Sequence, residues 1–308
     1  MALYVVGSIA YDTIITPFER RERVPGGSAT YISLAASLFC NDVKIISIVG
    51  YDFSGKEMEM FKARKINTDL VKVSKNYPTF YWAGRYNPDM NSRETILTEI
   101  NCLKELEIPD KIKDKCEVLV LGNIDPELQK KTIDAFPEKP PLIFLDTITL
   151  WITTRRQQLE ELLKYVNVVC INDEEARIWA NHYSLRKASQ YLLKDSVELV
   201  VIKKGEHGCM LVFKDNTIIF LPALPLEEIK DPTGAGDTFL GAAAGFLYDK
   251  KKPSQIDFIR AFSYGTIVAS FCVEDFGPQA LLNLSIDQIN KRMLTLRSMT
   301  NIYVTYEQ

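Results

Sequence analysis

The chain has 308 residues, of which 46% are hydrophobic and 25% are charged, and its formal net charge is −3. This composition predicts a globular protein with enough apolar side chains for a sizeable core. The weak negative charge argues against nucleic acids and membranes as partners, because neither would meet a basic surface. The chain contains two histidines, which excludes a metal site built from several histidines.

Six cysteines are scattered along the chain without a metal-ligand spacing, and most lie in apolar stretches. They are therefore predicted to be reduced thiols in the core. The N-terminal stretch MALYVVGSIAYDTI turns polar too early for a signal peptide, and no apolar run approaches the roughly 18 residues of a membrane span. We therefore expect a cytoplasmic protein.

Short β-branched runs alternate with amphipathic helical patterns along the chain. The predicted strands cover residues 3–9, 43–50, 117–123, 141–147, 166–172 and 198–204. The predicted helices cover residues 28–39, 55–65, 126–136, 156–166, 184–195, 235–250, 257–275 and 285–297. Near-continuous apolar strands separated by helices predict an α/β fold with a doubly wound, mostly parallel sheet flanked by helices. Since no linker or repeat interrupts the pattern, residues 1–308 are expected to form a single domain.

One region does not follow this alternation of strands and helices. Residues from about 70 to 100 alternate between apolar and polar positions and contain no convincing helical pattern. Such alternation is typical of strands with one buried face. We therefore expect antiparallel strands outside the main sheet, forming a small β-strand lid. Residues 12–25 leave room for a short contribution to this lid.

Aromatic side chains are concentrated in one strand of the expected lid. Phe80, Trp82 and Tyr86 would lie on one face of that strand, and Tyr81 and Arg85 on the other. Aromatic residues in this arrangement pack against a neighbouring element more often than they contact a ligand. A lid over a binding site is the functional alternative.

Residues 50–57 (GYDFSGKE) fit the P-loop pattern G-x-x-x-x-G-K. A P-loop next requires Ser or Thr to hold magnesium, whereas this chain has Glu57, whose carboxylate would repel phosphates. We interpret the segment as a turn and a helix start with Asp52 and Ser54 as caps.

The pair Gly26-Gly27 opens the first predicted helix. Paired glycines let a ligand approach the backbone closely, although ordinary turns also use them. Asp12 follows the first predicted strand. Its carboxylate can accept hydrogen bonds from ligand hydroxyls or serve as a turn residue.

Polar residues also follow the predicted strand that ends near residue 172. Asn172 can cap the next helix while Glu175 completes a capping box. A magnesium site, direct or water-mediated, is the functional alternative, because magnesium prefers hard oxygen ligands. Further on, Gly205 and Gly208 predict a hairpin, and Lys203 beside it adds positive charge that can contact a nucleotide.

Residues 231–239 (DPTGAGDTF) form the most specific motif. Gly234 and Gly236 remove side chains from the start of a long apolar helix, where backbone N–H groups attract anions. Thr233 is expected to supply a capping hydroxyl to that helix. Asp237 is itself negatively charged, so its position beside backbone N–H groups that attract anions has to be explained by the chemistry of the site.

The motif DPTGAGDTF strongly resembles the signature of the ribokinase-like (PfkB-type) carbohydrate kinase family. Nearly the whole chain follows the order of this family's motifs. The matching elements are Asp12 after the first strand, Gly26-Gly27 at the first helix, G-x-D-x-x-G at Gly50/Asp52/Gly55, N-x-x-E at Asn172/Glu175 and the glycine hairpin at Gly205/Gly208. The P-loop pattern is then explained, because Lys56 merely follows the family's turn.

The resemblance implies a ribokinase-like fold and ATP-dependent transfer of the γ-phosphate to a hydroxyl of a small sugar or nucleoside, with Mg²⁺. A monovalent cation is a further candidate. The resemblance makes Asp237 the catalytic base, and it makes the N–H groups of Gly234, Ala235 and Gly236 an anion hole. These roles agree with the chemistry, because phosphoryl transfer depends on positioning and charge neutralisation.

The remaining site residues are also implied by the resemblance. Asn172 and Glu175 would organise the phosphates and magnesium, with Glu175 acting on the metal through water. The other nucleotide-site residues would be Lys203, Gly205, Gly208 and Thr233. The residues that hold substrate would be Asp12, Gly26, Gly27, Tyr31 and Arg85.

Two departures from the family's pattern bear on the substrate. Tyr31 stands where sugar kinases of the family commonly carry Asn, and Lys203 stands where many members carry Thr. A nucleoside base would suit Tyr31 and the aromatic lid, whereas Arg85 or Arg93 could meet a phosphate already on the substrate.

Three functions therefore compete at this point. The first is a sugar or nucleoside kinase, the second is a phosphosugar kinase that uses a lid arginine, and the third is a catalytically silent nucleotide-binding sensor. The partner of the kinase would be a small sugar or nucleoside. Pairing of lid strands between two subunits is a candidate homodimer contact.

Overall fold

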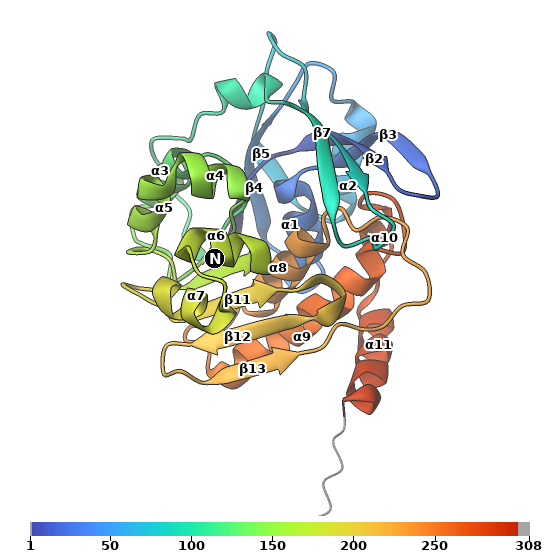
Figure 1. The fold of residues 1–308 in the computed structure, drawn as a ribbon. Coiled ribbons are helices and arrows are strands. Elements are labelled where there is room, and N and C mark those ends of the chain that lie inside the picture. The colour runs from blue at the N-terminus through green and yellow to red at the C-terminus, as the bar shows by residue number, and fades with distance from the viewer. Residues whose placement is uncertain (1, 301–308) are drawn as a thin grey trace, which may run out of the picture.

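A computed structural model describes residues 2–300 of the chain (Figure 1). In this part of the chain the larger of two sheets has nine strands. Their spatial order is β13 (Ile218–Leu221), β12 (Cys209–Phe213), β11 (Leu199–Lys203), β10 (Val168–Asn172), β9 (Leu142–Leu145), β8 (Cys116–Leu121), β1 (Ala2–Val6), β4 (Val43–Val49) and β5 (Asn67–Val73). Neighbouring strands pair in parallel from β11 to β5, whereas β12 and β13 extend the sheet as an antiparallel ribbon.

Helices cover both faces of the large sheet. One face is covered by α1 (Ser28–Ala36), α2 (Gly55–Ala63), α8 (Ala235–Phe246), α9 (Gln255–Cys272), α10 (Gln279–Leu282) and α11 (Ile286–Met299). The other face is covered by α3 (Pro126–Asp134), α4 (Thr149–Thr154), α5 (Arg156–Leu162), α6 (Asp173–Ala180) and α7 (Leu185–Leu192). Alternate residues of β1 enter the two cores, with Leu3 and Val5 on the first face and Tyr4 and Val6 on the second. The predicted doubly wound α/β fold is confirmed.

Local sequence signals explain where the helices begin. Asp125 accepts a hydrogen bond from the backbone of Glu127, and Pro126 occupies the first helical position of α3, where its missing N–H costs little. Ser254 and Asp257 form a capping box at the start of α9. The buried cysteines among the described residues are all free thiols, as predicted.

The smaller sheet contains the expected lid strands. Its order is β3 (Arg20–Gly26), β2 (Ala10–Ile15), β6 (Phe80–Tyr86) and β7 (Arg93–Glu99). The two hairpins are antiparallel, but β2 and β6 pair in parallel, so the sheet is mixed where a purely antiparallel one was expected. Figure 1 shows this sheet at the upper right, to one side of β4 and β5 of the large sheet.

The expected bounds of the lid need correction at both ends. Residues 70–73 belong to β5, an edge strand of the large sheet, where Leu70 packs against one core and Val71 against the other, while Lys72 and Val73 are exposed. The first hairpin, β2–β3, supplies two of the four lid strands and therefore more than the short contribution expected. β7 forms one edge of the small sheet with its side chains exposed, and self-association through it stays a prediction.

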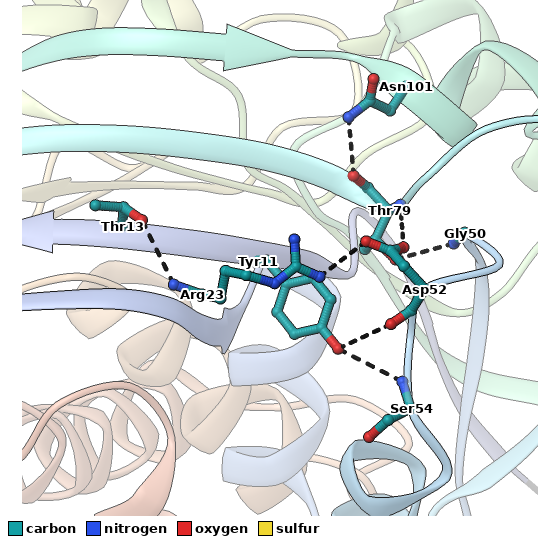
Figure 2. Close-up of polar contacts among 8 residues, drawn as sticks. All are labelled: Tyr11, Thr13, Arg23, Gly50, Asp52, Ser54, Thr79 and Asn101. Atoms are coloured by element: carbon teal, nitrogen blue, oxygen red, sulfur yellow. Dashed lines mark hydrogen bonds and ion pairs between the residues drawn. The ribbon is translucent and has the colours of Figure 1, made fainter.

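Asp52 connects the two sheets (Figure 2). One carboxylate oxygen accepts hydrogen bonds from the backbone N–H and the hydroxyl of Thr79, both at 2.7 Å, just before β6. The other oxygen accepts a bond of 2.8 Å from Arg23 of β3. Asp52 is therefore not the helix cap that was expected, whereas Ser54 does cap α2 by accepting from the backbone of Glu57.

The junction in Figure 2 is reinforced by Tyr11 of β2. Its ring lies under the guanidinium of Arg23, 4.2 Å from the ring centroid, and its hydroxyl donates to the backbone oxygen of Asp52 at 3.4 Å. Gly50 must be glycine here, because a Cβ would lie 2.0 Å from the backbone nitrogen of Thr79. The G-x-D-x-x-G turn thus joins the small sheet to the large one.

No helix among residues 2–300 is long and apolar enough to cross a membrane. The cytoplasmic location stays a prediction.

Candidate active site

The loop before α8 lies between the two sheets. Gly234 is the N-cap of α8 with a φ of 77°, a left-handed conformation that favours glycine, and no side chain caps the helix. The capping role expected of Thr233 is therefore wrong. Its hydroxyl instead lies 3.0 Å from the hydroxyl of Tyr86 in the small sheet.

The glycines of this loop are required by neighbouring side chains. A Cβ on Gly234 would lie 2.4 Å from ring atoms of Tyr31, and a Cβ on Gly236 would lie 3.1 Å from Nζ of Lys203. The N–H of Ala235 donates to the backbone oxygen of Pro232, so one of the three expected anion-hole donors already has a partner. The first turn of α8 still directs its N–H groups toward the end of the helix that attracts anions.

Tyr31 does not line an open substrate site in this structure. Its side chain is fully buried in α1, and its hydroxyl has no hydrogen-bond partner among the described residues. Burial raises the pKa of this hydroxyl well above its usual value, and the nearby carboxylate of Asp231 acts in the same direction. The ring of Tyr31 packs directly against Gly234 of the loop.

Asp237 lies in the first turn of α8 and is half-buried. Burial raises its pKa to about 7, the carboxylate of Asp146 acts in the same direction, and the ammonium group of Lys203 opposes both. A carboxyl group that titrates near neutral pH is suited to accept a proton and to release it again. Its position and protonation therefore fit the role of a general base.

Lys203 and Asp146 form a largely buried ion pair at the carboxyl ends of β11 and β9, the two strands that flank β10 in the large sheet. Nζ of Lys203, at the end of β11, lies 3.0 Å from Oδ1 of Asp146, which follows β9. Burial would lower the pKa of Lys203, but the charges of Asp146, Glu175 and Asp237 outweigh it and raise the pKa above its usual value. Lys203 is therefore charged and faces three carboxylates.

Asn172 and Glu175 form the predicted capping box of α6. The side chain of Asn172 accepts from the backbone of Glu175, and Glu175 accepts from the backbone of Asn172, both at 2.8 Å. Burial raises the pKa of Glu175 to about 7, although Lys203 opposes that shift. One carboxylate oxygen of Glu175 is thus engaged in the cap.

The described residues contain no group of three or more His, Cys, Asp or Glu side chains that could hold a metal ion. Direct coordination of Mg²⁺ by a protein cage is therefore not supported among them. Mg²⁺ usually keeps several waters and is bound through one or two carboxylates plus substrate phosphates. Glu175 and Asp146, both buried at the sheet edge, fit that kind of water-mediated contact.

Asp12 and the glycine pair meet where β2, β3 and α1 converge. A Cβ on Gly26 would lie 2.0 Å from a carboxylate oxygen of Asp12, so the glycine leaves room for this acid. Burial, together with the charges of Asp231 and Asp237, raises the pKa of Asp12 to about 8, and a hydrogen bond from the Gly27 backbone opposes the shift. The structure thus brings Asp12, Gly26 and Gly27 together.

The small sheet presents Trp82 beside Asp12. The two residues are direct partners in the parallel β2–β6 pair. The indole lies over Gly84, where a Cβ would be 2.1 Å from the ring, and its N–H donates to the hydroxyl of Thr95 at 3.3 Å. The ring is therefore held flat against the sheet on the face that carries Asp12.

Of the two candidate lid arginines, Arg93 lies on the face that carries Asp12. Arg93 pairs with Tyr86 across β6–β7, and its guanidinium lies 5.6 Å from the centroid of Trp82. Its charge lowers the pKa of Asp12 and of Asp237. Arg85 is exposed and, one residue from Tyr86, points to the opposite face. The substrate role of Arg85 stays a prediction, and this orientation favours Arg93 over it.

Gly205 and Gly208 form the turn between β11 and β12, as predicted. Both have positive φ, at 55° and 79°. A Cβ on Gly205 would lie 2.4 Å from Oδ1 of Asn91, which belongs to the β6–β7 turn. The glycine hairpin therefore contacts the small sheet directly.

Asp146 and Tyr86 are site residues that the sequence reasoning missed. An available signal for Asp146 was its position directly after a buried strand, where open α/β sheets bind ligands. Tyr86 was assigned to the correct strand face, but its contact with Thr233 spans 147 positions and leaves no local pattern.

Comparisons with known proteins show the family of this chain. The family model described as "pfkB family carbohydrate kinase" matches residues 2–284. A cytidine kinase of Thermococcus kodakarensis is 31% identical over 257 residues, covering 82% of this chain and 90% of that protein. A ribokinase of Staphylococcus aureus is 29% identical, with 89% of each chain covered.

A similar fold occurs in a nucleoside kinase of Burkholderia thailandensis in complex with ADP-inosine. That structure matches with a TM-score of 0.77 and covers 96% of each chain. At 18% identity this likeness concerns the fold alone.

Proposed function

This chain belongs to the pfkB family of carbohydrate kinases, and we propose that it transfers the γ-phosphate of ATP to a hydroxyl of a nucleoside. Its curated relatives include a cytidine kinase and a ribokinase, so it is a phosphotransferase that acts on hydroxyls of a sugar or nucleoside. The choice of a nucleoside over a sugar as the acceptor is what we propose.

The observation that carries the nucleoside proposal is the flat indole of Trp82 beside Asp12. A nucleoside has an aromatic base, which can stack on an indole, and ribose hydroxyls, which can donate to a carboxylate. A free sugar offers the hydroxyls but has no aromatic base to stack on the indole. The name of the Thermococcus relative and the bound inosine of the Burkholderia enzyme support the same acceptor class.

Asp237 is the group that we assign to the reacting proton. The carboxylate of Asp237 would accept the proton of the attacking hydroxyl as the new O–P bond forms and the bond between the γ-phosphorus and ADP breaks, so the hydroxyl need not ionise beforehand. The first turn of α8 and the ammonium group of Lys203 offset the negative charge that gathers beside it. The glycines and Asp237 thus act on different atoms, which explains an acid beside an anion site.

ATP supplies the phosphoryl group, and Mg²⁺ offsets the charge of its phosphates. Glu175 and Asp146 would hold the hydrated metal, and the hairpin at Gly205 and Gly208 would border the nucleotide. Lys203 keeps these carboxylates from repelling phosphates, because its charge lies 3.0 Å from Asp146. A monovalent cation stays a candidate, to be tested by adding K⁺ to the assay.

An ADP-release assay over matched acceptors tests the proposal. Cytidine and other nucleosides, free ribose and ribose phosphates would be compared with ATP and Mg²⁺. We expect the highest kcat/KM with a nucleoside. Faster turnover of a phosphorylated sugar would assign the site to a phosphosugar kinase that uses Arg93, and no turnover of any acceptor would favour the silent nucleotide sensor.

A further inference from the structure

Tyr86 belongs to the small sheet, yet its hydroxyl contacts the loop that precedes α8. Its Oη lies 3.0 Å from Oγ1 of Thr233, and the residue is buried, with 3% of its surface exposed. The ring packs among Ile14, Met90 and Phe276. The Tyr86 side chain therefore reaches from the small sheet to the loop before α8, with its ring held by packing and its hydroxyl held by the contact with Thr233.

The body of the protein holds other parts of the same loop. The buried carboxylate of Asp231 accepts from the N–H of Thr233 at 2.8 Å and from the N–H of Gly277 at 3.0 Å. The ring of Tyr31 lies directly against Gly234. The Thr233 side chain is bonded from both sides: it hydrogen-bonds the carboxylate of Asp231 in the body of the protein, and its hydroxyl contacts Tyr86 of the small sheet. Thr233 lies two residues before α8, the helix that carries Asp237.

A second contact ties the same hairpin to the other side of the proposed nucleotide site. Nδ2 of Asn91, in the β6–β7 turn, donates to Oε1 of Glu206 at 2.6 Å. Glu206 lies between Gly205 and Gly208 in the β11–β12 turn. The β6–β7 hairpin therefore contacts two segments assigned to the nucleotide, in addition to presenting Trp82 to the acceptor side.

We propose that Tyr86 is a positioning residue that couples the β6–β7 hairpin to the phosphoryl-transfer loop. Its hydroxyl fixes Thr233, and through Thr233 the start of α8, while the hairpin lies against the sheet edge. This inference rests on the proposed kinase function for its kinetic consequence. Because coupling between sites is reciprocal, nucleotide binding alone must also hold the hairpin in place.

The matched control is Tyr81, which lies on the opposite face of the same strand. Its hydroxyl donates to Oγ1 of Thr13 at 2.7 Å, a bond that stays within the small sheet. Tyr86→Phe and Tyr81→Phe therefore each remove one tyrosine–threonine hydroxyl bond and keep the ring. They differ in whether the lost bond reaches the loop before α8.

Steady-state kinetics of the two variants give the first test. We expect Tyr86→Phe to lower kcat about fivefold, the effect of one lost hydrogen bond, while KM for the nucleoside stays near the wild-type value. Tyr81→Phe should match the wild type in both constants. Equal kcat values for the two variants would overturn the proposed role of Tyr86.

Hydrogen exchange gives a second test that does not depend on turnover. In wild-type protein and Tyr81→Phe, ADP with Mg²⁺ should slow exchange in residues 80–99 without any acceptor present. Tyr86→Phe and Asn91→Ala should weaken that protection. Equal protection in all four proteins would contradict the coupling. Absence of turnover in the wild type would instead refute the kinase proposal, and the exchange result would still decide whether the hairpin responds to nucleotide.

Discussion

The two sheets of this protein use their side chains differently. The large sheet is covered by helices on both faces, so its chemical groups lie at the carboxyl ends of its strands, as with Asp146 and Lys203. The small sheet carries its chemical groups on one face, where Asp12, Trp82 and Arg93 lie. In the function proposed above, phosphoryl transfer belongs to the large sheet and α8, and choice of the acceptor belongs to the small sheet.

The largest effect is expected from a change at Asp237, the proposed base of phosphoryl transfer. Asp237→Asn keeps the size of the side chain but removes the proton acceptor, so kcat should fall about 10³-fold, within the range of general-base contributions. Affinity for ADP, measured by calorimetry, should change little, because the phosphate contacts remain. A variant with nearly wild-type kcat would show that Asp237 is not the base.

A change at Trp82 of the small sheet should weaken binding of the nucleoside instead of slowing the chemical step. Trp82→Ala removes the stacking surface, which is worth about 1–3 kcal/mol per base, and should raise KM for a nucleoside about 30-fold. Ribose has no base, so its KM should stay near the wild-type value. An equal rise for both acceptors would mean that Trp82 shapes the sheet and does not select the base.

The pH dependence can be shifted in opposite directions by the two members of the ion pair. Because the carboxylate form of Asp237 is the active base, kcat/KM should rise with pH through about 7. Lys203 lowers the pKa of Asp237 and Asp146 raises it. Lys203→Gln should therefore move the midpoint to higher pH and Asp146→Asn to lower pH, as measured from complete pH profiles. Shifts in the same direction would contradict this electrostatic account.

The smallest effect on chemistry is expected at the junction of the sheets. Asp52→Ala removes the carboxylate that binds Thr79 and Arg23, and should lower the free energy of unfolding by about 2 kcal/mol, the scale of hydrogen bonds to a charged group. Urea unfolding of the ligand-free protein measures this. Asp69→Ala is the control, because Asp69 is exposed and its hydrogen bonds to another side chain, among residues 2–300, are to Asn67. A loss no larger than that of the control would mean that the junction does not depend on Asp52.

Features with a local period or a fixed spacing could be predicted from the sequence. The capping box of Asn172 and Glu175, the turn at Gly205 and the strand face of Trp82 each depend on residues a few positions apart. The parallel sheet followed from apolar strands separated by helices for the same reason.

Contacts between distant segments could not be predicted in this way. Asp146 and Lys203 are 57 positions apart, and nothing in either segment specifies the other. Thr233 was expected to cap a helix because a hydroxyl beside a helix start usually does so, and the approach of the small sheet gives it a different partner. Alternation placed Arg85 and Trp82 on opposite faces of one strand, but it could not show that Arg93 of the next strand lies on the face that carries Asp12.

Product analysis of the wild-type enzyme with ATP, Mg²⁺ and cytidine tests the central claim most directly. We predict that ADP and a phosphorylated nucleoside form in a one-to-one ratio, faster than the corresponding products form with ribose. ADP without phosphorylated nucleoside, or faster phosphorylation of ribose, would contradict the assignment of the small sheet's indole and carboxylate face to a nucleoside.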